Sequence, residues 1–231
     1  MLVYPTLTDS GINNMATDWW LFENAESPLF RHYKWIINET SFGYGQDWEW
    51  VEKVTSLSVN QLIRRPTGGG IVKHGKDWTY CLVIPKNHKS FTISPLDFYK
   101  YVHQSIGKAL RKQEIITNLQ PCPAVKGRVI PGDCFEEPVG WDLMDFHTNV
   151  KIAGAAMKRS RKGLLLQGTI FVNNEWELDH EEFYSNLVVF FGEMLGDKEI
   201  REASLDTSIE ERKIVSKQFS QLCWKKERKW V

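Results

Sequence analysis

The spacing of apolar residues along the chain predicts five helices. Ser94 before Pro95 is a cap followed by proline at the first helical position, and Asp179 with Glu182 has the pattern of a capping box. Asn13 or Asn14 can cap the first helix, after which apolar residues recur on one face. The predicted helices cover residues 14–22, 51–59, 95–110, 180–191 and 207–224.

Short apolar runs between turn residues predict strands. The run at 78–85 is short, apolar throughout and ended by Pro85, as expected of a buried strand. The predicted strands cover residues 2–4, 30–37, 78–85, 141–144, 149–158 and 164–172. No internal repeat and no low-complexity linker interrupts them, so we expect one large domain.

Composition narrows the class of protein. The 231 residues are 42% hydrophobic and 13% aromatic, which is enough for a sizeable core. The formal net charge is zero, which argues against a general nucleic-acid binder. We find no signal peptide, no apolar run of the roughly 20 residues that span a membrane, and no metal-type cysteine spacing. We therefore expect a cytoplasmic protein with reduced cysteines, no membrane contact and no metal site.

A glycine-rich stretch, Arg64 to His74, is the most unusual local pattern. Three consecutive glycines, Gly68 to Gly70, are costly to order and make sense where backbone approaches a ligand or takes a positive φ. Arg64 and Arg65 supply cationic forks suited to carboxylate or phosphate. The alternative is a glycine hairpin turn with solvated arginines.

Two further segments carry candidate chemistry. Cys134 lies in a proline-rich stretch, 117–140, without periodicity, where long loops are often functional. On its own this cysteine is more consistent with a small, half-buried filler. The basic run Lys158 to Lys162 is either a solvated hairpin tip or a docking patch for an acidic partner.

Three motifs together resemble the lipoate–protein ligase and octanoyltransferase family, which shares its catalytic domain with biotin ligases. The first, Arg64 to His74, is similar to the family's RRxxGGGxVxH signature. The second, Lys151 to Ala156, is similar to its K-[VI]-[SA]-G-[SA]-A motif, and the third, Leu165 to Thr169, to its LxHGT strand. A biotin ligase fits less well, because this sequence does not have the arginine-rich GRGRxGR loop of biotin ligases.

The resemblance implies an α/β (α+β) fold, a mixed β-sheet flanked by helices, with an acyl chain buried between glycine loop and sheet. It implies one catalytic domain over residues 1–231, without a C-terminal accessory domain. It implies attachment of an octanoyl or lipoyl group to a lysine of a lipoyl domain, in a 2-oxoacid dehydrogenase or the glycine-cleavage H protein. The catalytic residues it implies are Cys134 and Lys151. The substrate-binding residues it implies are Arg64, Arg65, Gly68, Gly69, Gly70, His74, Gly154, Ala155, Gly168 and Thr169.

The family uses two chemistries. Ligases use ATP and Mg²⁺ to activate free lipoate, whereas transferases take octanoate from acyl carrier protein through a cysteine thioester and need no cofactor. The segment from Cys134 to Leu143 resembles the transferase pattern C-F-x-x-P-x-x-[YW]-[DE]-L and favours that branch. Three residues depart from the transferase pattern. The third glycine, Gly70, is the version found in ligases. Gln167 replaces the histidine of the LxHGT motif, and Met157 stands where the transferase branch usually has glutamine. A ligase, or a lipoyl-binding paralogue without turnover, therefore stays open.

Overall fold

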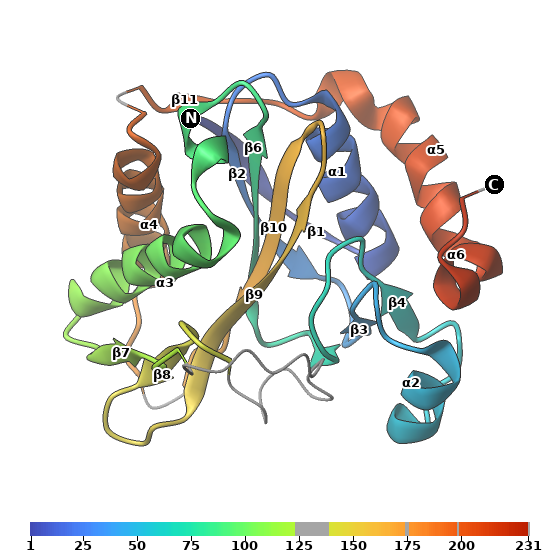
Figure 1. Ribbon diagram of the computed structural model, residues 1–231, viewed down its shortest axis with the longest axis horizontal. Coiled ribbons are helices and arrows are strands. Elements are labelled where there is room, and N and C mark those ends of the chain that lie inside the picture. Colours follow the sequence, from blue (N-terminus) through green and yellow to red (C-terminus); the bar gives the residue numbers. More distant parts are fainter. Residues whose placement is uncertain (123–138, 174–175, 198, 231) are drawn as a thin grey trace.

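The computed structural model describes residues 1–122, 139–173, 176–197 and 199–230. A large mixed β-sheet lies at its centre (Figure 1). Its strands are β1 (Leu2–Asp9), β2 (Leu29–Trp35), β6 (Trp78–Pro85), β7 (Thr117–Leu119), β8 (Leu143–Asp145), β9 (Lys151–Arg159), β10 (Gly163–Ile170) and β11 (Arg201–Glu202). They are arranged in the order β11-β1-β2-β6-β10-β9-β8-β7. β1 pairs in parallel with β2 and β11, and the other pairs are antiparallel.

The central strands β6 and β10 are buried along their whole length. Successive side chains of a strand point to opposite faces, so each strand contributes to two cores. Leu82 and Leu166, which pair in register, lie in one core, while Val83 and Leu165 lie in the other. Burial on both faces explains why the sequence of these strands is a continuous apolar run.

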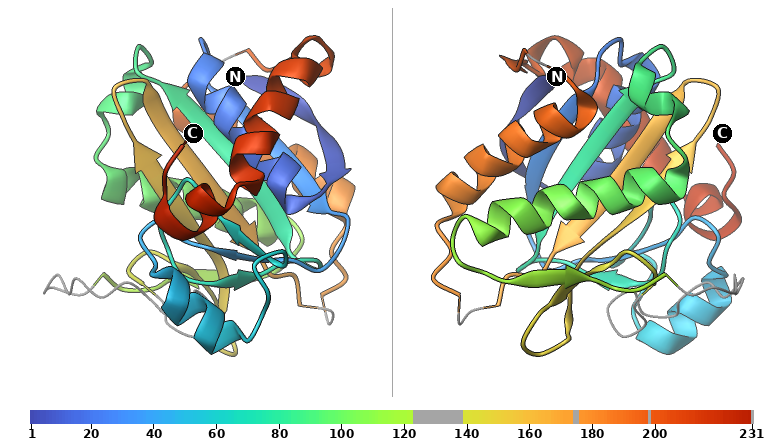
Figure 2. Two further views of the ribbon diagram at one scale, coloured as in Figure 1. Left: turned by 90° about the vertical axis from the view of Figure 1, so that its right-hand side faces the viewer. Right: turned by 60° about the vertical axis from the view of Figure 1, so that its left-hand side comes forward.

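Helices cover both faces of the sheet (Figure 2). α3 (Pro95–Arg111) and α4 (His180–Leu195) cover one face, and α1 (Gly11–Asn24) and α5 (Ile209–Ser220) cover the other. α6 (Leu222–Glu227) follows α5 directly. The expected α/β class, a mixed sheet flanked by helices, is confirmed.

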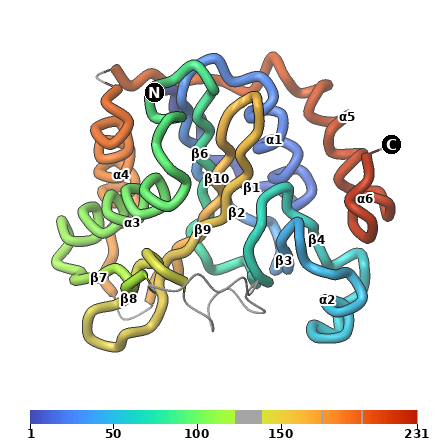
Figure 3. Tube along the Cα trace, in the orientation of Figure 1, coloured from blue at the N-terminus to red at the C-terminus, as the bar shows by residue number. Residues whose placement is uncertain are grey.

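A smaller unit positions the glycine-rich stretch. It consists of the three-stranded sheet β4 (Leu62–Arg64), β3 (Thr40–Phe42) and β5 (Val72–Lys73), with helix α2 (Trp48–Thr55). The glycines lie in the connection between β4 and β5, hereafter the glycine loop (residues 65–71). This loop lies beside β9 of the large sheet (Figure 3), where a Cβ on Gly69 would be 3.3 Å from the Ala156 Cβ. Two 3₁₀ turns, Lys89–Thr92 and Asp206–Ser208, complete the described elements.

Helix starts were predicted with mixed success. α3 begins at Pro95 as predicted, and the Ser94 side chain accepts a hydrogen bond from the Asp97 amide. The first helix begins at Gly11 with Ser10 as its cap, so the prediction of Asn13 or Asn14 was wrong. The reason is tertiary, because the Asn14 side chain is buried and contacts the backbone of β1 and β2 instead.

The helix predicted at 207–224 is in fact two helices, α5 and α6. Gln221 between them is extended, with φ −70° and ψ 143°. The break turns Trp224 back onto β4, where its indole Nε1 donates to the Arg64 carbonyl at 3.1 Å. Periodicity could not reveal this contact, since its partners are 160 positions apart. Among the described residues, no helix is long and apolar enough to span a membrane.

Candidate active site

The glycine loop is held against the β3 segment by close backbone contacts. The Tyr44 amide donates to the Thr67 carbonyl at 2.7 Å, and the Arg65 amide donates to the Phe42 carbonyl at 2.9 Å. Gly43 has to be glycine, because a Cβ there would lie 2.0 Å from the Gly69 carbonyl oxygen. The aromatic and glycine-rich segment after β3 is therefore a wall of the loop rather than an independent surface turn.

The three glycines of the loop differ in their conformation and surroundings. Gly69 has φ +83°, which favours a residue without Cβ. A Cβ on Gly68 would meet nothing within 4 Å, so the described fold does not require a glycine there. The Gly70 carbonyl accepts a hydrogen bond from Arg65 Nη2 at 2.7 Å. The space beside Gly68 is where backbone can approach another molecule.

Arg64 connects distant parts of the chain. Its Nη1 donates to the carbonyls of Tyr44 and Gln46 at 2.7 and 2.9 Å, and its Nε donates to the Lys225 carbonyl at 2.8 Å. The guanidinium also lies over the Phe42 ring, 4.5 Å from its centroid. These contacts join β4, the wall of the glycine loop and α6. These acceptors are protein carbonyls, and a phosphate or carboxylate partner for Arg64 stays a prediction.

The Arg65 side chain points inward and begins a series of buried polar contacts. Its Nη2 donates to the carbonyls of Gly68 and Gly70, and its Nη1 donates to Ser41 Oγ at 2.6 Å. Ser41 Oγ is also 2.6 Å from His74 Nε2. The guanidinium thus fixes the curvature of the glycine loop and connects it to His74.

His74 is positioned by a carboxylate and an indole. Its Nδ1 is 2.7 Å from Asp77 Oδ2, and its ring stacks on Trp35 with centroids 3.8 Å apart. Burial lowers the pKa of His74, so we assign a neutral ring with Nδ1–H donating to Asp77 and the Ser41 hydroxyl donating to Nε2. The Trp35 indole is in turn fixed by its hydrogen bond to Thr79 Oγ1 at 2.8 Å.

Asp77 accepts several hydrogen bonds at the end of this series of polar contacts. Its carboxylate accepts from the hydroxyls of Thr79 and Thr169 and from the Gly75 amide, in addition to His74. Burial alone would raise the pKa of Asp77, but these contacts hold it at about 2. Asp77 therefore remains ionised at neutral pH and anchors Thr169.

A narrow cavity lies between the glycine loop, α1 and strands β9 and β10. Its volume is about 30 Å³. It is lined by Met15, Tyr33, Trp35, Arg65, Val72, His74, Thr79, Gly154, Ala155, Ala156, Gln167, Gly168 and Thr169. Ligand sites for small molecules usually enclose about 300–1,000 Å³, so a medium acyl chain fits only if the loop or lining side chains move outward.

Lys151, at the start of β9, does not itself line the cavity, but its ammonium lies beside Gly154, which does. Its ammonium forms a buried ion pair with Asp142, with Nζ 2.8 Å from Oδ2. Tyr99 donates to Asp142 Oδ1, and the Tyr99 hydroxyl accepts from the Ala155 amide at 3.1 Å. The Val139 amide also donates to Asp142, at 2.7 Å. Because the carboxylate that pairs with the buried ammonium is itself fixed by these donors, the cation is positioned rather than mobile.

Two glycines of the predicted site make room for neighbouring side chains. A Cβ on Gly154 would be 2.6 and 2.8 Å from Lys151 Cε and Nζ, so the glycine lets the ammonium lie against the cavity wall. A Cβ on Gly168 would be 2.3 to 2.5 Å from the Tyr80 ring. The small residues of both motifs are therefore needed by this fold itself.

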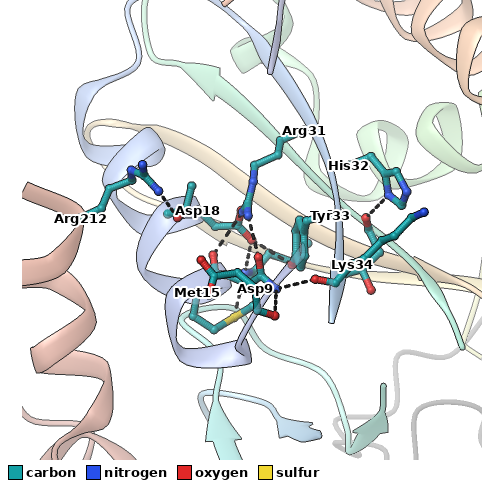
Figure 4. A network of polar contacts seen from close by, with 12 residues as sticks. Asp9, Met15, Asp18, Arg31, His32, Tyr33, Lys34 and Arg212 are labelled. Atoms are coloured by element: carbon teal, nitrogen blue, oxygen red, sulfur yellow. Dashed lines mark hydrogen bonds and ion pairs between the residues drawn. The ribbon is translucent and has the colours of Figure 1, made fainter. Parts of the chain in front are cut away.

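Gln167, which replaces the motif histidine, joins the glycine loop to α1. Its Oε1 accepts from Thr67 Oγ1 at 2.7 Å, and its Nε2 donates to Asp18 Oδ2 at 2.8 Å. Asp18 is also ion-paired with Arg31 at 2.6 Å and accepts from the Tyr33 hydroxyl (Figure 4). The side chain is buried and has partners at both ends, so the replacement preserves a polar connection below the loop.

The structure brings together most of the predicted site. Both arginines, the glycine loop, His74, Lys151 and the small residues of β9 and β10 surround one cavity or support its walls. Cys134 lies outside the described residues, so its role stays a prediction. No cluster of three or more His, Cys, Asp or Glu that could hold a metal occurs in the described ranges.

Sequence reasoning missed several supporting residues. Asp142 stood inside the quoted transferase-like segment but was given no role, although a carboxylate is the natural partner of a buried lysine. Ser41, Asp77 and Tyr99 carried no signal of their own, because their partners come from other elements. Asp18 lies in a predicted helix, and its buried contacts with Arg31 and Gln167 were not foreseen.

Comparisons with known proteins agree with this geometry. The family model of the lipoyl protein ligase A/B catalytic domain matches residues 11–214. The octanoyltransferase LipM of Oceanobacillus iheyensis is 32% identical over 171 residues, covering 71% of this chain and 61% of the relative. The chain spans about three fifths of the length of the first LipM relatives it matches.

Solved structures extend the likeness to nearly the whole chain. The bipartite lipoate protein ligase of Thermoplasma acidophilum, described with its E2 lipoyl domain, has a TM-score of 0.71 at 17% identity, covering 97% of this chain and 94% of that one. A lipoate-protein ligase A bound with ATP has a TM-score of 0.72 at 19% identity, covering 97% of each chain. At such identities the likeness concerns the fold alone. The family model, in contrast, matches most of this chain. The chain therefore belongs to the lipoyl protein ligase A/B catalytic domain family.

Proposed function

We propose that this protein acts in protein lipoylation, as an acyltransferase that moves an octanoyl group from acyl carrier protein to a lysine of a lipoyl domain. The family and the LipM relatives support this activity. The observation that carries it is the apolar cavity beneath the glycine loop, whose lining residue Gly154 lies beside the Lys151 ammonium. Once the loop or the lining side chains move outward, an apolar slot with a cation close to one lining residue suits a medium acyl chain that ends in a carbonyl.

In the first half-reaction, the Cys134 thiolate attacks the carbonyl carbon of the octanoyl thioester on the carrier. The tetrahedral intermediate expels the carrier thiolate, which takes up the proton that Cys134 lost. The octanoyl group is then a thioester on Cys134. Such an intermediate divides one difficult acyl transfer into two easier ones.

In the second half-reaction, the neutral amine of the acceptor lysine attacks the new thioester. An amide forms, and the amine proton returns to the Cys134 sulfur. In both steps the Lys151 ammonium stabilises the oxyanion that develops on the carbonyl oxygen. Its contact with Asp142 holds it in place. Because each step exchanges one acyl bond for another, the reaction needs neither ATP nor Mg²⁺.

The proposed acceptors are lipoyl domains of 2-oxoacid dehydrogenases or the glycine-cleavage H protein. Residues 1–231 would act as a single catalytic domain, and a cytoplasmic location stays a prediction. The residues proposed to contact the acyl chain are those around the cavity, including Gly154, Ala155, Gly168 and Thr169. Arg64 and Arg65 serve this site by holding the glycine loop.

Mass spectrometry of the protein after incubation with octanoyl carrier tests the proposal. We expect an added octanoyl mass on Cys134, transfer to a lipoyl domain, and loss of both in Cys134→Ser. Cys122→Ser is the matched control, because Cys122 is an exposed free thiol whose removal leaves the proposed nucleophile in place.

Other outcomes would refute the transferase. If no acyl mass appears, and ATP, Mg²⁺ and free lipoate modify a lipoyl domain equally well in Cys134→Ser, the protein is a ligase. If neither donor modifies the acceptor, it is a lipoyl-binding paralogue without turnover.

A further inference from the structure

The basic residues of the β9–β10 hairpin do not form one patch. Lys162 is ion-paired with Glu23, and Arg159 donates to two backbone carbonyls ahead of α3. Lys158 also faces the side of the sheet that carries α1, but its Nζ lies 5.5 Å from the centroid of the Trp19 ring rather than on a carboxylate. Lys162 and Arg159 therefore have intramolecular polar partners, whereas Lys158 lies over aromatic rings.

A second cation reaches the same place from the end of the chain. Lys158 Nζ lies 4.9 Å from the centroid of the Tyr44 ring, and Arg228 Cζ lies 5.8 Å from it. Tyr44 is 37% exposed, and Arg228 is exposed. In the described part of the chain, no salt bridge within 4.0 Å joins either cation to a carboxylate. We call this group, Tyr44 with Lys158 and Arg228, the Tyr44 patch.

The Tyr44 patch adjoins the acyl slot. The Tyr44 amide bonds to the Thr67 carbonyl of the glycine loop. Lys158 follows Ala156, which lines the cavity, by two positions on β9, so both side chains lie on the same face of the sheet. Although the chain as a whole is neutral, the Tyr44 patch therefore carries cations without carboxylate partners. Such a local field attracts an acidic partner.

We propose that the Tyr44 patch docks the acidic acyl carrier that delivers the octanoyl group, which rests on the proposed function. Lys151 and Lys158 are seven positions apart on β9, or about 23 Å at about 3.3 Å per residue. An acceptor lysine has only a four-carbon stem, so its domain must dock close to the carbonyl beside Lys151. The carrier holds its acyl group on a long phosphopantetheine arm and can dock at this distance.

Octanoyl transfer to a lipoyl domain from two donors tests the docking surface. One donor is the octanoyl carrier protein, and the other is octanoyl-pantetheine, which has the arm without the protein. For Lys158→Glu and for Arg228→Glu we expect the KM for the carrier to rise about tenfold at low ionic strength, and the effect to shrink at about 1 M salt. The kcat and the KM for octanoyl-pantetheine should stay within about twofold of wild type. Lys112→Glu, at the C-terminal end of α3, is the matched control.

Each other outcome has a definite meaning. An equal rise in KM for octanoyl-pantetheine would mean that the variants distort the slot, and a rise in KM for the lipoyl domain would mean that the acceptor docks here. Either result overturns the assignment. If wild type transfers from neither donor, the proposed function fails, and the docking surface is judged by carrier affinity from fluorescence anisotropy. An affinity unchanged by both charge reversals then refutes it.

Discussion

Replacing Gln167 with glutamate tests whether the buried connection between α1 and the glycine loop is as described. The change is nearly isosteric and affects one group, the amide nitrogen that donates to Asp18 Oδ2 at 2.8 Å. When the introduced carboxyl is protonated and its hydroxyl faces Asp18, it donates as the amide does. Its carbonyl oxygen can still accept from Thr67. When it is ionised, two carboxylates meet in a buried site.

The size of the expected loss in free energy of unfolding follows from this repulsion. Burial and the Asp18 carboxylate raise the pKa of the introduced carboxyl above its unfolded value of about 4.3. Below that pH both states are protonated and the variant resembles wild type. As pH rises above about 4.3, each unit costs the variant about 1.4 kcal/mol until the raised folded pKa is reached. If the proton is held up to pH 7, the loss is about 3–4 kcal/mol.

Urea denaturation of wild type and variant, from about pH 4.5 to about pH 7.5, measures this loss. We expect the difference in free energy of unfolding to grow with pH. Gln167→Leu is the control, because it removes the same hydrogen bonds without adding a titrating group, and its difference from wild type should not change with pH. A pH-independent difference for Gln167→Glu would refute the contact with Asp18.

Two further predictions concern the buried carboxylates. Lys151→Met should lower kcat by about 10²–10³-fold through loss of oxyanion stabilisation. It should also destabilise the fold by about 3–5 kcal/mol, because Asp142 is left buried and unpaired. Adding Asp142→Asn should recover stability, measured by urea denaturation, without recovering activity; recovered activity would contradict the role of Lys151. The low pKa of Asp77, about 2, contributes about 2 kcal/mol of stability that is complete above about pH 4 and is lost as pH falls towards 2. Denaturation across this range should show a loss that Asp77→Asn lacks, and an equal loss in that variant would exclude Asp77 as its source.

Local signals in the sequence were sufficient for several elements. The strand Trp78–Pro85 was predicted with its observed bounds, and α3 begins at Pro95 as its cap predicted. These features depend on neighbours within a few positions, such as a proline at a helix start or an apolar run between turn residues. Motifs, read together, also indicated the family.

Long-range contacts were decided only by the tertiary structure. Arg64 and Arg65 suggested a phosphate or carboxylate partner, yet their observed acceptors are protein groups, one of them 161 positions away. Gln167 looked like a lost histidine, but it joins Thr67, 100 positions earlier, to α1. Motif spacing, which is local, named some of the residues around the cavity, such as Gly154, Gly168 and Thr169, but not Met15 or Trp35, which α1 and β2 bring to it. Which atoms satisfy each buried polar group depends on which elements meet in space, and only the folded chain decides that.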